Sequence, residues 1–94
     1  MEYIKTTNEV DFMAAIIAAY RSRTITMQVY TFLSEQGIYC SLISTPREAG
    51  VGCGLSIKFD ESYFGRVSSI STYPTFAGFF RVMDSNGRRI VTRV

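Results

Sequence analysis

The stretch RTITMQVYTFLSEQGIYCSLIS, at residues 23–44, changes its apolar spacing from that of a helix to that of a strand. In its first part, apolar side chains recur at i, i+4, i+7 and i+8, at Ile25, Val29, Phe32 and Leu33. This spacing places them on one face of an amphipathic helix. Because glycine tolerates the left-handed conformation that often follows a helix, Gly37 predicts the end of a helix over residues 23–36.

Polar residues mark the start of this helix, and a strand follows its end. The hydroxyl of Ser22 or Thr24 can accept a hydrogen bond from an N–H group of the first turn. After the glycine, residues 38–44 alternate between two faces, with Cys40 and two aliphatic residues on one of them. This alternation predicts a strand that directs Cys40 toward one face of a sheet, most simply into the core.

Upstream of the helix lies an almost wholly apolar run at residues 12–20. Its periodicity fits either a buried strand or an alanine-rich helix capped by Asn8. A helix here would run almost directly into the helix at residues 23–36, so we prefer a central strand over residues 14–21, although alanine is depleted in strands. Residues 1–7 predict an edge strand or a loose arm.

Downstream, residues 55–60 alternate between apolar and polar side chains and predict a half-buried strand. Asp60 or Ser62 can cap a shorter helix that follows. Its apolar stripe consists of Phe64, Val67 and Ile70. The sequence Asp84-Ser85-Asn86-Gly87 is typical of a tight turn, and strands at residues 79–83 and 89–94 flank it. A hairpin therefore closes the chain.

The order of these elements predicts the α+β class. Strand, helix, strand, strand, helix and strand make a ferredoxin-like split βαβ sandwich, in which two helices cover one face of an antiparallel sheet. The C-terminal hairpin adds a last strand. A chain of 94 residues suits a single domain, at residues 1–94.

The second face of the sheet has no predicted cover. Apolar side chains exceed what two helices can bury, and the candidates for this open face are Tyr39, Ile43, Phe79 and Phe80. We therefore expect a homo-oligomer that forms through the open face or through an edge strand.

Composition excludes several classes of function. No run reaches the roughly 18 apolar residues of a membrane span, and the acidic start does not resemble a signal peptide, so we expect a cytoplasmic protein without membrane contact. Two cysteines and no histidine do not make a metal site, and we expect two free thiols. Arg88, Arg89 and Arg93 cluster on the hairpin, but a net charge of +2 and the lack of an aromatic RNA-binding motif argue against nucleic acid.

The loop at residues 44–55 places one cysteine, Cys53, between Gly52 and Gly54. Glycines permit close backbone approaches, and successive N–H groups around them can form a concavity for an anion. Arg47 can add positive charge, provided that Glu48 turns elsewhere, for example toward Arg23. Without further information, Cys53 is either a core residue or a reactive thiol.

Three pieces of sequence resemble a family of small bacterial proteins known as selenium/sulfur carrier-like. They are Ser22-Arg23-Thr24 at the helix start, Thr45-Pro46-Arg47-Glu48-Ala49, and Val51-Gly52-Cys53-Gly54-Leu55-Ser56. The resemblance covers roughly residues 14–59. It implies a cytoplasmic thiol that holds sulfur or selenium, received from a donor protein, and it places this thiol on Cys53.

The first functional hypothesis is therefore a carrier or thiol relay, which needs no cofactor and is closer to a carrier than to an enzyme. Cys53 is its reactive residue, and the candidate ligand-binding residues around it are Ser22, Arg23, Thr24, Thr45, Arg47, Gly52 and Gly54. Anions favour helix N-termini, which is why the helix start belongs to this set. The alternative hypothesis is a noncatalytic module that binds a small ligand or a protein through the same loop.

Overall fold

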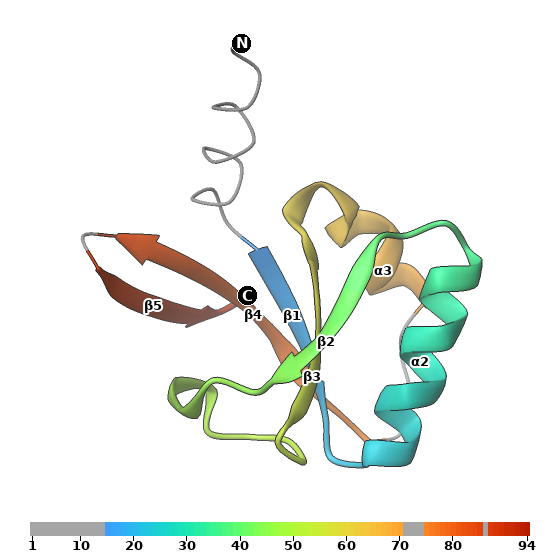
Figure 1. Ribbon diagram of the computed structural model, residues 1–94, viewed down its shortest axis with the longest axis horizontal. Helices are drawn as coiled ribbons and strands as arrows, with labels where there is room; N and C mark the ends of the chain where they lie inside the picture. Colours follow the sequence, from blue (N-terminus) through green and yellow to red (C-terminus); the bar gives the residue numbers. More distant parts are fainter. Residues whose placement is uncertain (1–14, 71–74, 86) are drawn as a thin grey trace, which may run out of the picture.

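The computed structural model of the chain describes residues 15–70, 75–85 and 87–94. Within them, a five-stranded antiparallel sheet carries two α-helices (Figure 1). The elements in chain order are β1 (Ala15–Tyr20), α2 (Arg23–Glu35), β2 (Cys40–Ser44), β3 (Leu55–Asp60), α3 (Phe64–Ile70), β4 (Phe76–Ser85) and β5 (Arg88–Arg93), with 3-10 turns η1 (Arg47–Ala49) and η2 (Glu61–Tyr63). The predicted arm at residues 1–7 lies outside the described residues.

The strand order is β2-β3-β1-β4-β5, and every neighbouring pair is antiparallel. The α+β class, the antiparallel sheet and the closing hairpin are confirmed. This order differs from a simple split βαβ sheet, because β5 adds a strand beside β4. The ferredoxin-like assignment stays a prediction.

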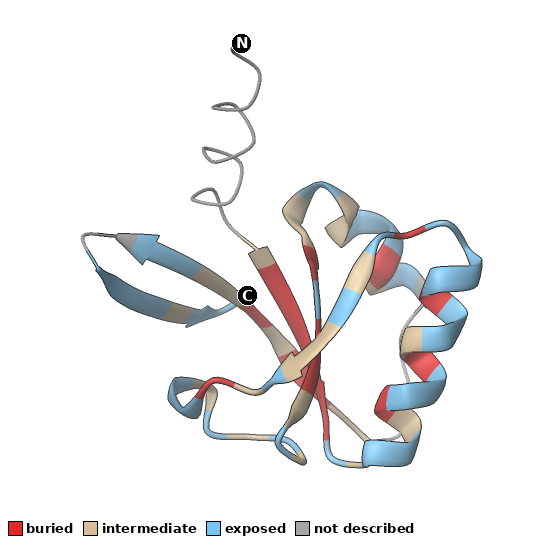
Figure 2. Ribbon diagram, viewed as in Figure 1, coloured by how far each residue is buried: buried red, intermediate tan, exposed pale blue. Residues whose placement is uncertain are grey.

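Strand β1 forms the centre of the molecule, as predicted. Residues 16–20 are completely buried, which Figure 2 shows as the red central strand. Ile16, Ala18 and Tyr20 pack in the cluster that includes both helices, and Ile17 and Ala19 pack on the opposite face. A strand covered on both faces needs no polar alternation, which explains its continuous apolar sequence.

Helix α2 begins and ends at the residues that its sequence predicts. The hydroxyl of Ser22 accepts a hydrogen bond from the N–H of Ile25 at 3.1 Å. At the other end, Gly37 has φ of 80°. The N–H of Gly37 donates to Ser34, and that of Ile38 donates to Leu33, which is the Schellman arrangement.

The buried face of α2 is rotated from the predicted stripe. Its fully buried residues are Thr26, Val29 and Leu33, whereas Phe32 is 36% exposed. The prediction for Phe32 was wrong because Thr26 takes a place on the buried face. Burial of this threonine is tolerated because its hydroxyl donates to the carbonyl of Ser22 at 2.8 Å.

The second face of the sheet is less open than predicted. Ile43 and Phe80 lie there, but they pack in a cluster that includes Ala49 and Val51. These two residues belong to the loop at residues 44–55, called the glycine loop below. Phe79 lies on the helix face, against the rings of Phe59, Phe64 and Phe76, so its assignment to the open face was wrong. Tyr39 is exposed.

Strand β4 begins three residues earlier than predicted, with an irregularity in its pairing with β1. Gly78, at φ of 142°, gives room to the guanidinium of Arg93 on β5. This guanidinium lies 5.2 Å from the ring centroid of Phe80 and donates to the carbonyl of Ala77 at 3.0 Å. One arginine thus ties the hairpin to the start of β4.

The second helical segment also follows its predicted cap. The carboxylate of Asp60 accepts a hydrogen bond from the N–H of Ser62 at 2.9 Å and so caps η2, which leads into α3. The two hydrogen bonds from Ser62 lower the pKa of Asp60. Val67 is buried and Phe64 partly buried on the helix face of the sheet.

Candidate functional site

The glycine loop leaves β2 at Ser44 and returns to β3 at Leu55. Two hydrogen bonds close its base: the N–H of Thr45 donates to the carbonyl of Gly54 at 3.0 Å, and the hydroxyls of Thr45 and Ser56 are 2.6 Å apart. Ser56 is fully buried, so this contact holds a hydroxyl pair away from solvent. Thr45 therefore holds the two ends of the loop together.

The far part of the loop is fastened to the end of the central strand. The N–H of Cys53 donates to the carbonyl of Tyr20 at 2.9 Å. Gly52 has φ of 96°, and a β-carbon on it would lie 3.2 Å from the same carbonyl oxygen and 3.5 Å from the β-carbon of Ala19. Glycine is required here both for its backbone angle and for this close approach.

This fastening bears on the anion site expected in the loop. We expected the N–H groups around Gly52 and Gly54 to form a concavity for an anion. Since the N–H of Cys53 is committed to Tyr20, the central donor of that concavity is used in holding the loop.

The side chain of Cys53 is half-buried and meets α2. Its Sγ lies 3.8 Å from Oγ1 of Thr26 and 3.7 Å from the carbonyl oxygen of Leu55. Thr26 was missed in the sequence, which suggested Thr24 instead. The sequence did contain a signal for Thr26. It lies four positions after the helix cap Ser22 and next to the apolar stripe, where a side chain faces the sheet.

Two oxygen atoms that can accept a hydrogen bond lie beside Sγ. Thr26 has one hydroxyl proton, and it points to the carbonyl of Ser22 at 2.8 Å, so the threonine oxygen offers a lone pair to Cys53. The carbonyl of Leu55 is also an acceptor. The thiol proton can therefore reach either of two acceptors, and the cap residue Ser22 is linked to Cys53 through Thr26.

The positively charged candidates are exposed side chains. Arg23 and Thr24 are exposed on the first turn of α2, and Arg47 is exposed on η1. Arg47 lines two shallow hollows beside the loop, and the lining of neither includes Cys53. The structure thus joins Ser22 to Cys53 through Thr26, and it brings Thr45, Arg47, Gly52 and Gly54 together around the smaller hollow.

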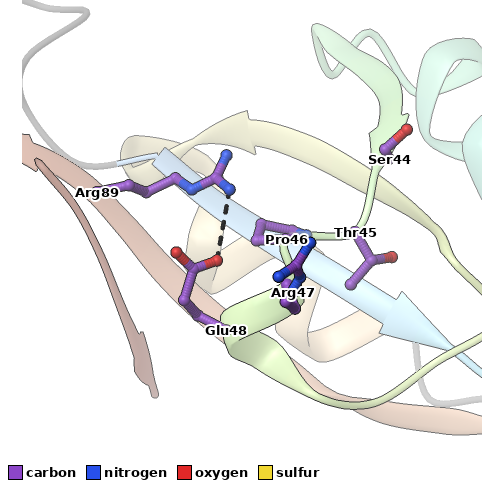
Figure 3. Close-up of a pocket in the computed structure, with 6 residues that line it drawn as sticks. All are labelled: Ser44, Thr45, Pro46, Arg47, Glu48 and Arg89. Atoms are coloured by element: carbon purple, nitrogen blue, oxygen red, sulfur yellow. Dashed lines mark hydrogen bonds and ion pairs between the residues drawn. The ribbon is translucent and has the colours of Figure 1, made fainter.

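The larger hollow, of about 660 Å³, lies between the loop and β5 (Figure 3). Arg89 extends from β5 and donates to the carboxylate of Glu48 at 3.4 Å. The pKa of Glu48 is lowered, first by a hydrogen bond from its own backbone N–H and further by Arg89 and Arg47. Glu48 therefore does turn elsewhere, but to Arg89 and not to Arg23.

The family described as "Putative Se/S carrier protein-like" matches residues 15–71, which is well over half of the chain. The chain belongs to this family. Comparison with curated proteins and with solved structures gave no match.

The Se/S carrier protein-like match runs from β1 through α3, and it includes the glycine loop and both cysteines. The hairpin of β4 and β5, which carries Arg89 and Arg93, lies outside the matched residues. The resemblance seen in the sequence is confirmed, with a longer extent than residues 14–59.

Cys40 is an internal comparison for the thiol of this carrier-like domain. Both cysteines are free and half-buried, and each Sγ lies 3.8 Å from a hydroxyl on α2: that of Ser34 for Cys40 and that of Thr26 for Cys53. Burial raises the pKa of Cys40, and a hydrogen bond with Ser34 opposes this rise. Cys40 packs against the helix-face core cluster, as predicted.

Two further findings concern the described part of the chain alone. None of its helices has the length and apolar character needed to cross a membrane. No group of three or more His, Cys, Asp or Glu side chains comes together there in a way that could hold a metal ion.

Proposed function

We propose that this Se/S carrier-like protein holds a sulfur or selenium atom on Cys53 and passes it to an acceptor. The observation that carries the proposal is the family match across the glycine loop, together with a half-buried thiol whose backbone is fixed to Tyr20 at 2.9 Å. A carrier needs a sulfur that is accessible enough to react and held firmly enough to meet its partner in one orientation.

The loading step follows thiol–disulfide chemistry. The Cys53 thiolate attacks the outer sulfur of a persulfide on a donor protein. A new S–S bond forms on Cys53, the S–S bond of the donor breaks, and the donor leaves as a thiolate that takes up a proton. The oxidation state of the transferred sulfur is unchanged, so no cofactor is consumed, and the selenium reaction has the same balance.

Neighbouring residues would divide the remaining work. Thr26, held by Ser22, accepts a hydrogen bond from the resting thiol, and Thr45, Gly52 and Gly54 keep the loop in shape. Arg23, Thr24 and Arg47 are exposed and would be available to contact the donor protein. This assignment includes a cytoplasmic location, where thiols stay reduced.

We also propose that the sheet is a ferredoxin-like split βαβ arrangement extended by β5. The support is that β3 lies between β1 and β2, the two strands that α2 connects.

The test compares two matched variants, Cys53→Ser and Cys40→Ser. Each protein is incubated with a cysteine desulfurase that carries a persulfide, and its intact mass is measured. We expect the wild type and Cys40→Ser to gain about 32 mass units per sulfur, and Cys53→Ser to gain none. Equal loading of both variants, or a Cys53 thiol that resists alkylation in the folded protein, contradicts the proposal.

The alternative, a noncatalytic binding module, is favoured by the hollow that Arg47 and Arg89 line, since Cys53 is not among its lining residues. In that case Arg47→Ala would weaken binding of an anionic partner, whereas Cys53→Ser would not. Measuring both variants against the same partner separates the two functions.

A further inference from the structure

The sheet has two outer strands, β2 and β5, and they differ in how they are protected. An outer strand presents a row of backbone N–H and C=O groups to which another strand can pair, and proteins commonly block such edges with charged side chains or proline. Strand β5 carries three arginines in six residues: Arg88, Arg89 and Arg93. Strand β2, with the sequence CSLIS, carries neither charge nor proline.

The surface beside β2 is also apolar. Tyr39, immediately before the strand, is 85% exposed, and Leu42 within it is half-buried. The contact between Ser34 and Cys40 shows that one side of α2 overlooks β2. Met27 lies on that side, seven residues before Ser34, and is 47% exposed.

The charge pattern favours a second copy of the chain as the occupant of this edge. An antiparallel pairing of β2 with itself, centred on Leu42, sets Leu42 opposite Leu42, Ser41 opposite Ile43, and Cys40 opposite Ser44. No charged residue lies between residues 37 and 45, so the pairing of two β2 strands would not set like charges opposite one another. Pairing of β5 with itself about residues 90 and 91 would set Arg88 opposite Arg93, which is repulsive.

We propose that β2 pairs with β2 of a second copy, which joins two sheets into one of ten strands with two-fold symmetry. The contact is isologous, because the same edge serves both copies. Tyr39, Met27 and Leu42 supply the apolar area beside the backbone hydrogen bonds. The homo-oligomer expected from the sequence is thereby assigned to an edge strand and not to the open sheet face.

This dimer is independent of the proposed carrier function. The loop that holds Cys53 is fastened to β1 through Tyr20, and β3 lies between β1 and the β2 edge. Loss of the dimer should therefore leave sulfur loading of Cys53 unchanged, and Cys53→Ser should leave the dimer intact. Failure of one proposal is distinguishable from failure of the other.

The mass in solution tests the proposal, through sedimentation velocity across micromolar concentrations. We expect twice the chain mass of 10.6 kDa. Ser41→Glu puts a negative charge at the β2 edge. Within the monomer, this charge would lie opposite Lys58 on β3, so the substitution should not destabilise the fold. Thr92→Glu is the matched control, since Thr92 is exposed on β5 and lies opposite Arg81.

Ser41→Glu should raise the dimer dissociation constant at least about tenfold, and Thr92→Glu should leave it unchanged. Disulfide cross-linking checks the register in a background that carries Cys40→Ser and Cys53→Ser. On oxidation, Leu42→Cys should form a cross-linked dimer, because residue 42 lies opposite its own copy. Ile43→Cys should not, because residue 43 lies opposite Ser41. A wild type that sediments as a monomer overturns the proposal. So does a dimer that Ser41→Glu leaves intact, or one that Thr92→Glu weakens equally.

Discussion

Replacing Gly52 by alanine tests whether the glycine loop depends on its fastening to β1. The added β-carbon would lie 3.2 Å from the carbonyl oxygen of Tyr20, a backbone atom in a fully buried strand residue that cannot move aside easily. The loop must shift instead, and the hydrogen bond from Cys53 to Tyr20 would lengthen or break.

The expected loss of unfolding free energy in Gly52→Ala is the sum of three contributions. A left-handed backbone costs a residue with a β-carbon about 1–2 kcal/mol. A lost hydrogen bond costs about 0.5–1.5 kcal/mol, and the smaller conformational freedom of unfolded alanine returns about 0.4–1 kcal/mol. We therefore expect Gly52→Ala to lower the free energy of unfolding by about 2 kcal/mol, within a range of about 0.5–3 kcal/mol.

Gly54 and Gly50 provide matched controls. Gly54 has φ of 92°, close to that of Gly52, and Gly50 has φ of 66°, but a β-carbon on either would meet nothing within 4 Å. Each alanine substitution should cost only about 1 kcal/mol, from the backbone angle alone. Urea denaturation followed by circular dichroism measures all three variants. The reasoning is refuted if Gly52→Ala is no more destabilising than Gly54→Ala.

Three further predictions concern neighbouring features. Thr26→Val keeps the shape of a fully buried side chain but removes the hydrogen bond to Ser22, so it should cost about 1 kcal/mol in urea denaturation; no loss would mean that this bond contributes nothing. Gly78→Ala would place a β-carbon 2.8 Å from the guanidinium of Arg93. The loss of unfolding free energy that it causes should therefore be smaller by about 0.5–1 kcal/mol in an Arg93→Ala background. A double-mutant cycle in which the two losses simply add would contradict this contact. Asp60→Ala removes an exposed cap and should cost about 0.5 kcal/mol at neutral pH. Since hydrogen bonds from Ser62 lower the pKa of Asp60 in the folded state, that contribution exists above about pH 4 and is lost as pH falls through the lower folded pKa. Unfolding curves from neutral to acid pH should therefore converge for the two proteins, and a constant gap would speak against the cap.

Local chemistry made the element boundaries predictable. Ser22 and Gly37 act on their immediate neighbours, so the limits of α2 follow from residues within four positions of each. The central strand was harder, because Ala18 and Ala19 have little preference for strands. Their small size matters only in three dimensions, where β1 packs on both faces and the loop approaches Ala19 closely.

Long-range contacts account for what could not be predicted. Glu48 and Arg89 are 41 positions apart, and their pairing depends on β5 lying beside the loop. Thr26 and Cys53 are 27 positions apart, and the half-turn that separates Thr26 from the predicted Thr24 depends on how α2 is rotated over the sheet. Periodicity gives the existence of a buried face but not this rotation.

The hydrogen bond between Cys53 and Tyr20 makes the backbone amide of Cys53 a reporter on how firmly the glycine loop is held to β1. Surface loops normally exchange their amide hydrogens with solvent through small local openings. This amide is bound to the fully buried last residue of β1, so its exchange requires the loop to detach from that strand. Slow hydrogen exchange in an otherwise exposed loop would mark the thiol as part of the rigid core, whatever atom it carries.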